Sequence, residues 1–228
     1  MKEMFDSAKE SKRSRGEEIQ TDGLVHFIGD GYVGLYGDTG KVRRLLFVYK
    51  PGDVFPMMDG IEDPLKRTYT YIAMKRTQVR SLPEHVFNDG LKDPKALKDM
   101  LDYTRKISRL QFERINNMQQ TQVFARLIER LLFFSRRLGT EDGGKVRIDV
   151  PLSHVDIATS IGATRETVNR YMRQLEAQGI LSVRRQHITI NDPQRLQQVL
   201  NQKDPLLKPN WTLLGIATAS STLLTQII

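Results

Sequence analysis

Five side chains with long polar reach lie close together in the stretch TRETVNRYMR, residues 164–173. They are Arg165, Glu166, Asn169, Arg170 and Arg173. At 3.6 residues per turn, their spacing puts all five on one side of a helix. Arg can donate two hydrogen bonds to guanine O6 and N7, and Glu can accept one from cytosine N4. This face therefore has the chemistry needed to read the edges of DNA bases.

The residues before and within this face predict two short helices joined by a tight turn. Ser153 is placed to cap the first helix, and Asp156 nearly completes a capping box. Gly162 falls where the turn needs a permissive backbone, and Thr164 can cap the second helix. The small Ala158 lets the two helices approach closely. Apolar residues at helical spacing supply the inner faces: Val155, Ile157, Ala158 and Ile161 in the first helix, and Val168, Met172 and Leu175 in the second.

A hairpin is expected after the second helix, which Gly179 ends. The segment ILSVRRQHITI predicts strands at 180–183 and 187–190 around an Arg-Arg-Gln turn. A helix-turn-helix followed by a hairpin makes a winged helix. Its polar groups would bind double-stranded DNA, some at base edges and some at phosphates that set the register. The predicted DNA-binding residues are Ser153, Thr164, Arg165, Glu166, Asn169, Arg170, Arg173, Arg184 and Arg185.

A polar helix face is often no more than a solvated surface. Here the cap, the Ala–Gly spacing, the apolar inner faces and the hairpin coincide in one segment, which favours DNA recognition. An enzyme has less support, because the four His residues show no metal-ligand spacing and no Ser/His/Asp constellation stands out. The Gly-x-Gly fragments of HFIGDGYVGLYGDTG precede no helix, so they do not indicate a phosphate loop. The chain is therefore predicted not to be an enzyme.

Composition agrees with an anionic partner. The chain has 228 residues, 39% of them hydrophobic, and a net charge of +8 with a pI of about 9.7. This content suffices for a buried core, and the excess of positive charge favours nucleic acid or another anionic surface. The absence of Cys excludes disulfides, iron–sulfur clusters and a thiolate nucleophile. The N-terminal segment MKEMFDSAKESKRSRGEE has no apolar core and is not expected to be a signal peptide, so a cytoplasmic location is predicted.

The N-terminal half predicts strands followed by long helices. Residues 19–88 hold short apolar or alternating runs separated by Gly-Asp, Asp-Thr-Gly and Pro-Gly-Asp turns, which is typical of a small sandwich or barrel. From about Pro94 a helix of about 25 residues is expected, long enough to favour a coiled-coil homodimer over packing on its own sheet alone. Its apolar stripe is Leu97, Met100, Leu101, Thr104, Ile107, Leu110, Ile115 and Met118. A second helix is predicted at 122–139, with Gly139 as its C-cap and a core face of Val123, Leu127, Leu131 and Phe134.

The stretch IGATRETVNRYMRQLEAQGIL resembles the Crp/Fnr transcription regulators, and the resemblance extends over about residues 17–200. It implies an α+β fold with an N-terminal double-stranded β-helix (a β-roll like cyclic-nucleotide-binding domains), a long dimerisation helix and a C-terminal winged helix-turn-helix. The implied domains are 1–93, 94–121 and 122–203, followed by a tail at 204–228. The resemblance also implies base-reading roles for Arg165, Glu166 and Arg170 at a palindromic TGTGA-like site, and a contact with RNA polymerase.

The sensor half resembles the cyclic-nucleotide pattern less well. After Gly52 and Asp53, the first Arg is the late Arg67, and the adenine-reading pair of the long helix falls at Gln111 and Phe112. The segments GGKVRIDVPLSHVDIATSIGATR and HITINDPQRL look closer to the cyanobacterial nitrogen regulators, which bind 2-oxoglutarate. That resemblance makes a 2-oxoglutarate-like effector more expected than cyclic AMP.

The residues proposed for such an effector are Phe55, Arg67 and Arg109, whose two guanidinium groups could clamp a dicarboxylate. Salt bridges at the two arginines, haem ligation by His26 or His85, and a regulator that needs no effector are the alternatives. The segment WTLLGIATASSTLLTQII, residues 211–228, is uncharged but short and rich in Thr and Ser. A packed, partner-binding or disordered tail is favoured over a membrane-associated one.

Overall fold

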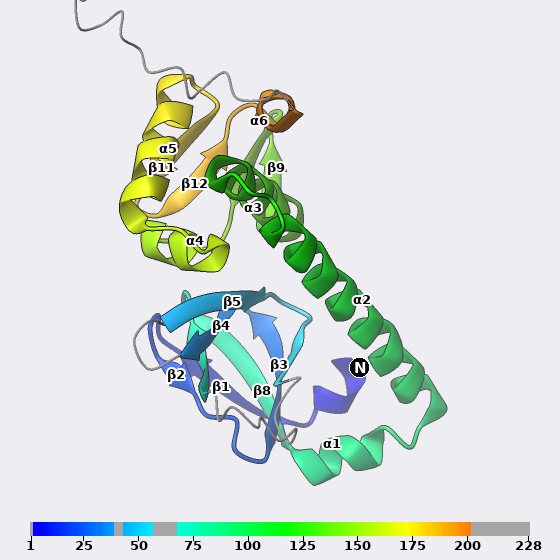
Figure 1. Cartoon of the computed structure of the whole chain (residues 1–228). Helices are drawn as coiled ribbons and strands as arrows, with labels where there is room; N and C mark the ends of the chain where they lie inside the picture. Colours follow the sequence, from blue (N-terminus) through cyan, green and yellow to red (C-terminus); the bar gives the residue numbers. More distant parts are fainter. Residues whose placement is uncertain (1, 39–42, 57–67, 202–228) are drawn as a thin grey trace, which may run out of the picture.

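The computed structural model describes residues 2–38, 43–56 and 68–201, and its N-terminal part is two four-stranded antiparallel sheets. One sheet has the order β1-β8-β3-β6 and the other β2-β7-β4-β5 (Figure 1). A short helix, η1 (Lys2–Phe5), precedes them. The strands are β1 (Lys9–Arg13), β2 (Glu18–Ile19), β3 (Leu24–Asp30), β4 (Val33–Asp38), β5 (Arg43–Tyr49), β6 (Val54–Phe55), β7 (Thr68–Ala73) and β8 (Thr77–Pro83). The predicted β-roll is thereby confirmed.

Turn chemistry and aromatic packing hold this β-roll together. Between β3 and β4, Gly31 has φ +91°, and a Cβ there would lie 2.5 Å from the Thr77 Cα, so only glycine fits. Inside the roll, the ring of Phe55 stacks on those of His26 and Tyr71. Both ring nitrogens of His26 are hydrogen bonded, to Ser81 Oγ and to the Gln20 carbonyl. His26 is therefore an ordinary hydrogen-bonded core residue.

A long helix, α2 (Pro94–Met118), follows the short α1 (Glu84–Gly90) and runs along the β-roll (Figure 1). Asp93 caps it by accepting a hydrogen bond from the Ala96 N–H. Tyr103 and Ile107 are buried against the roll, and the Tyr103 hydroxyl bonds both the amide and the carbonyl of Val54. The apolar residues of α2 were predicted to form one stripe, but they divide between two faces. One face packs on the β-roll and the other is exposed. The exposed apolar side chains are Leu97 (45%), Leu101 (49%), Phe112 (71%), Ile115 (57%) and Met118 (40%).

In the C-terminal part, helices α4, α5 and α6 and a small sheet pack around a central helix, α3 (Val123–Leu138). Its sheet has the order β11-β12-β10-β9. The remaining elements are β9 (Gly139–Asp142), β10 (Lys145–Ile148), α4 (His154–Ile161), α5 (Arg165–Ala177), β11 (Leu181–Arg184), β12 (His187–Ile190) and α6 (Pro193–Asn201). Helix α3 is buried well beyond its predicted core face, since Phe124, Ile128 and Phe133 are buried too. This helix is the centre of the C-terminal core.

Gly139 ends α3 as predicted, but for a different reason. Its φ is −98°, which is not the left-handed conformation of a glycine C-cap. A Cβ at this position would instead lie 2.3 Å from the Ser135 carbonyl oxygen and 2.5 Å from a Val146 methyl group. Lack of space, rather than backbone conformation, requires glycine here.

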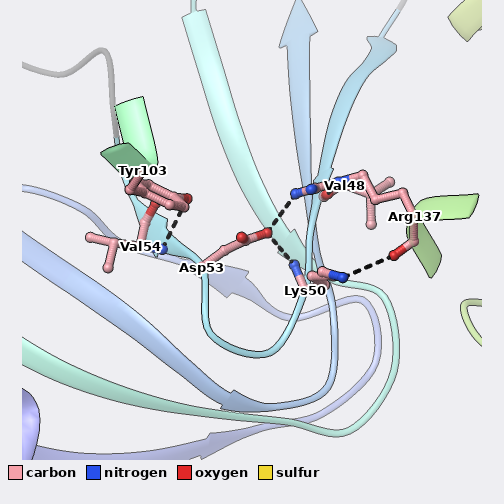
Figure 2. A network of polar contacts seen from close by, with 6 residues as sticks. All are labelled: Val48, Lys50, Asp53, Val54, Tyr103 and Arg137. Atoms are coloured by element: carbon pink, nitrogen blue, oxygen red, sulfur yellow. Dashed lines mark hydrogen bonds and ion pairs between the residues drawn. The ribbon is translucent and has the colours of Figure 1, made fainter. Parts of the chain in front are cut away.

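A buried ion pair joins the β-roll to α3 (Figure 2). Arg137 Nη2 lies 2.6 Å from Asp53 Oδ2, and the two side chains are 5% and 3% exposed. The Asp53 carboxylate also accepts from the Lys50 amide, while Lys50 Nζ donates to the Arg137 carbonyl. The Arg137 guanidinium further lies over the Phe47 ring. Burial raises the pKa of Asp53, and the adjacent Arg137 opposes that rise.

In the described part of the chain, no helix is both long and apolar enough to cross a membrane. The tail at 204–228 lies outside the described residues, so its predicted packing stays a prediction.

Removing one partner of the buried pair should be costly. Asp53→Ala leaves the Arg137 guanidinium buried without its counter-ion, and we expect a loss of about 3–5 kcal/mol in the free energy of unfolding. Urea denaturation measures this loss. The double variant Asp53→Ala/Arg137→Met removes both charges and should recover part of it. Equal stability of wild type and Asp53→Ala would contradict the role assigned to the pair.

Candidate nucleic-acid interface

The turn between α4 and α5 is fixed by local hydrogen bonds. Ser153 caps α4 with a complete capping box: its Oγ accepts from the Asp156 N–H, and the Asp156 carboxylate accepts from the Ser153 N–H. Gly162 follows α4 with φ +63°, as the turn requires. Thr164 then caps α5 by accepting from the Thr167 N–H. The predicted helix-turn-helix is therefore present with its predicted caps.

Helix α5 buries one side and exposes the other. Val168, Met172 and Leu175 are fully buried against the C-terminal core, as their spacing predicted. On the opposite side Thr164, Arg165, Glu166, Arg170 and Arg173 are exposed, and Asn169 is half-buried. The structure thus brings the predicted reading residues onto one open face at the start of a helix. Their contacts with DNA bases stay a prediction.

His154, which the sequence analysis did not single out, lies beneath this face. It is the first residue of α4 and shares a side-chain hydrogen bond with Asn169. Burial lowers the pKa of His154; Glu176 opposes this, and Arg165 and Arg173 lower it further. An isolated His at the start of a short helix carries no periodic signal, which is why sequence reasoning missed it.

The hairpin β11–β12 forms the wing, with Arg184 and Arg185 exposed at its tip. Arg185 and Gln186 both have positive φ, 49° and 69°, which closes the turn tightly. The Gln186 carbonyl accepts from the Leu152 N–H, and its side chain accepts from the Arg15 guanidinium of the β-roll. The wing is therefore anchored at its turn, leaving its arginines free of these contacts.

Helix α4 is docked on β5, so the C-terminal part is held by the β-roll (Figure 1). The Tyr36 hydroxyl donates to Asp156 Oδ1 at 3.0 Å, and the Leu45 amide donates to Thr159 Oγ1 at 3.3 Å. Burial, followed by the nearby Asp156 carboxylate, raises the pKa of Tyr36, which keeps its hydroxyl protonated. Asp156 thus serves both the α4 cap and the contact with the β-roll.

The residues predicted for an effector do not gather in one cavity. Phe55 is fully buried in the aromatic core, and Arg109 is an exposed residue of α2 that pairs with Glu113. Arg67 lies outside the described residues. A cavity of about 670 Å³ does lie between the β-roll and α2, and Gln111, Phe112 and Arg114 are among its lining residues. Neither Phe55 nor Arg109 lines it.

The lowered pKa of His154 predicts a pH dependence of stability. The folded state favours the neutral imidazole, so this contribution is present above the unfolded-state pKa of about 6.5. It is lost as the pH falls through 6.5 towards the lower folded-state pKa. Chemical denaturation of wild type and His154→Gln between pH 8 and pH 5 should therefore show the stability advantage of wild type shrinking with acidity. A difference that grows on acidification would contradict the burial argument.

Comparison with known proteins agrees with this architecture. Residues 125–199 match the model of the Crp-like helix-turn-helix domain. The chain is 28% identical over 157 residues to a CRP-like cAMP-activated global transcriptional regulator of Mycobacterium tuberculosis, covering 68% of this chain and 69% of that protein. It is 30% identical over 133 residues to the global nitrogen regulator of Synechocystis, covering 58% and 59%.

Among solved structures, FixK2 from Bradyrhizobium japonicum has a TM-score of 0.69 at 26% identity, covering 84% of this chain and 96% of that one. A CooA mutant from Carboxydothermus hydrogenoformans shares the fold, with a TM-score of 0.68 at 20% identity over 87% and 90% of the two chains. The similar proteins of Mycobacterium tuberculosis and Synechocystis are both named as regulators. The match shows that residues 125–199 form a Crp-like helix-turn-helix domain, and the β-roll and the long helix before it give the chain the fold of the Crp/Fnr transcription regulators.

Proposed function

We propose that the chain acts as a homodimer that recognises a palindromic TGTGA-like DNA site and is gated by a small-molecule effector. The observation that carries this proposal is the exposed face of α5, where Arg165, Glu166 and Arg170 stand together on a rigidly capped helix. Such a helix can lie in the major groove with its N-terminal side chains at base edges.

The spacing of these side chains suits successive base pairs. Arg165 and Arg170 are five residues apart, which corresponds to a rise of about 7.5 Å along the helix. Each guanidinium could therefore reach a different guanine, with Glu166 accepting from a cytosine between them. Ser153, Thr164 and Arg173 are suited to phosphate contacts, as are Arg184 and Arg185 on the wing.

The exposed apolar face of α2 supports a dimer. Seven positions follow one another at alternating intervals of four and three residues: Leu97, Leu101, Thr104, Ser108, Gln111, Ile115 and Met118. This is the a/d spacing of a coiled coil. The residues at the two ends of this row are apolar and about half-exposed, whereas the three in the middle are polar. A second copy of α2 would cover the apolar ends, and recognition helices about 34 Å apart would then match one turn of DNA.

The cavity between the β-roll and α2 supports effector gating. It adjoins the polar middle of the α2 seam at Thr104, Ser108 and Gln111, so a ligand there would contact the dimerisation helix. A ligand shifts the dimer geometry only if it binds one arrangement better than another. We propose residues 1–93 as the sensor, 94–121 as the dimerisation segment and 122–203 as the DNA-binding domain. We also propose RNA polymerase as a partner and a cytoplasmic location, on the strength of the similarity to Crp-like regulators.

Base recognition can be tested by DNA binding at fixed salt. Arg165→Ala and Arg170→Ala should each weaken binding to a TGTGA palindrome by about 1–3 kcal/mol and relax the preference at one base pair. Arg105→Ala is the matched control, because Arg105 is an exposed arginine of α2 that pairs with Asp102, away from α5. Selection of bound sequences from a random pool reports the base preference. Unchanged preference in both variants would show that other residues read the DNA.

The dimer can be tested by sedimentation. Ile115→Lys places a charge in the proposed seam and should shift the protein from dimer to monomer at micromolar concentration. Val86→Lys is the control, since Val86 is 42% exposed on α1 and outside the seam. A wild-type monomer, or dissociation of the Val86→Lys control, would count against this seam.

A further inference from the structure

A basic groove lies where α2, α3 and the end of β5 meet. It has a volume of about 320 Å³. Five basic residues line it: Lys50, Lys106, Arg109, Arg136 and Arg137. The other lining residues are Glu113 and the apolar Leu110 and Phe133. The groove is distinct from the larger cavity on the other side of α2, with which it shares no lining residue. No residue of α5 or of the wing lines it.

The positive charge of the groove is only partly neutralised. Asp53 pairs with Arg137, and Glu113 pairs with Arg109 at 3.4 Å. Lys50 Nζ donates to a carbonyl, that of Arg137, rather than to a carboxylate. Of the five cations that line the groove, only Arg109 and Arg137 have a carboxylate at ion-pair distance among the described residues, which leaves Lys50, Lys106 and Arg136 without one.

The neighbouring positive charges disfavour the charged form of Lys50. Burial lowers the pKa of Lys50, and the charges of Arg137 and Lys106 lower it further, while Asp53 opposes the shift. Its ammonium keeps donor capacity beyond the one carbonyl that it bonds, because an ammonium has three N–H groups. An anion in the groove would relieve the repulsion and use these donors.

We propose that this groove binds a small molecule carrying a phosphate or diphosphate group. Lysine and arginine donors converge on it from three elements, as in sites that hold polyvalent oxyanions by charge-assisted hydrogen bonds. The volume is at the lower end of the range for small-molecule sites, about 300–1,000 Å³. Leu110 and Phe133 would contact the organic part of the ligand.

Occupation of the groove would strengthen the junction between the three parts of the chain. Lys106 and Arg109 belong to α2, Arg136 to α3 and Lys50 to the β-roll, and all four line the groove together with Arg137. Figure 2 shows Lys50 beside the Arg137–Asp53 pair. A bridging anion would favour the arrangement in which α3 is held on the roll. An effect of this anion on DNA binding rests on the proposed function, whereas binding of the anion to the groove does not.

Calorimetric titration of the full-length protein with inorganic pyrophosphate tests the site without DNA. The double variant Lys106→Gln/Arg136→Gln should weaken pyrophosphate binding by about tenfold or more, because two charge-assisted contacts are lost. Lys92→Gln/Arg105→Gln removes the same charge from exposed residues outside the groove and should stay within about twofold of wild type. Titrations with inorganic phosphate and with succinate, at matched ionic strength, distinguish phosphate from dicarboxylate chemistry.

The proposal is supported if pyrophosphate binds wild type and the control variant but binds the groove variant weakly. It is overturned if wild type binds no pyrophosphate, if both double variants lose affinity equally, or if succinate binds as well as pyrophosphate. Intact pyrophosphate binding in the groove variant together with weakened non-specific DNA binding would also overturn it and assign the groove to a flanking DNA backbone. Failure of the TGTGA prediction would leave the pyrophosphate titration unaffected.

Discussion

The ion pair between Arg137 and Asp53 is the interaction on which the arrangement of the whole chain depends. Two charges taken out of water are tolerated only when they are paired and hydrogen bonded. Asp53 satisfies this requirement with Arg137 and the Lys50 amide, and Arg137 also donates to the Val48 carbonyl. Because one partner belongs to the β-roll and the other to α3, the pair specifies how the C-terminal part sits on the β-roll.

Residues that stabilise the helix-turn-helix also form its contact with the β-roll. Asp156 completes the cap of α4 with one carboxylate oxygen and accepts from Tyr36 of the β-roll with the other. Thr159 of the same helix accepts from Leu45 of β5. At the other end, Arg126 of α3 donates to the Ile161 carbonyl and to the carbonyls of Gln120 and Thr121, which connect α2 to α3. A shift of the β-roll would therefore act directly on the helix that supports α5.

Helix α2 contributes residues to the β-roll contact, to the proposed dimer seam and to the basic groove. Its inner face packs on the β-roll through Tyr103 and Ile107, and its exposed apolar residues supply the proposed dimer seam. A further side, with Lys106 and Arg109, borders the basic groove. One helix can do all this because 25 residues at 3.6 per turn offer several faces to different neighbours. A change at any one face can therefore be transmitted to the others as a movement of one rigid rod.

The sequence alone determined the features that depend on local rules. Ser153, Gly162 and Thr164 fix the two caps and the turn within a few residues of chain, and the spacing of Val168, Met172 and Leu175 fixes the buried side of α5. Only the tertiary structure decided which face of α2 packs on the roll, since both faces carry apolar residues. It also paired Asp53 with Arg137 across 84 residues and placed His154 under Asn169. Such contacts leave no periodic trace, because they depend on how separate elements dock rather than on the conformation of either one.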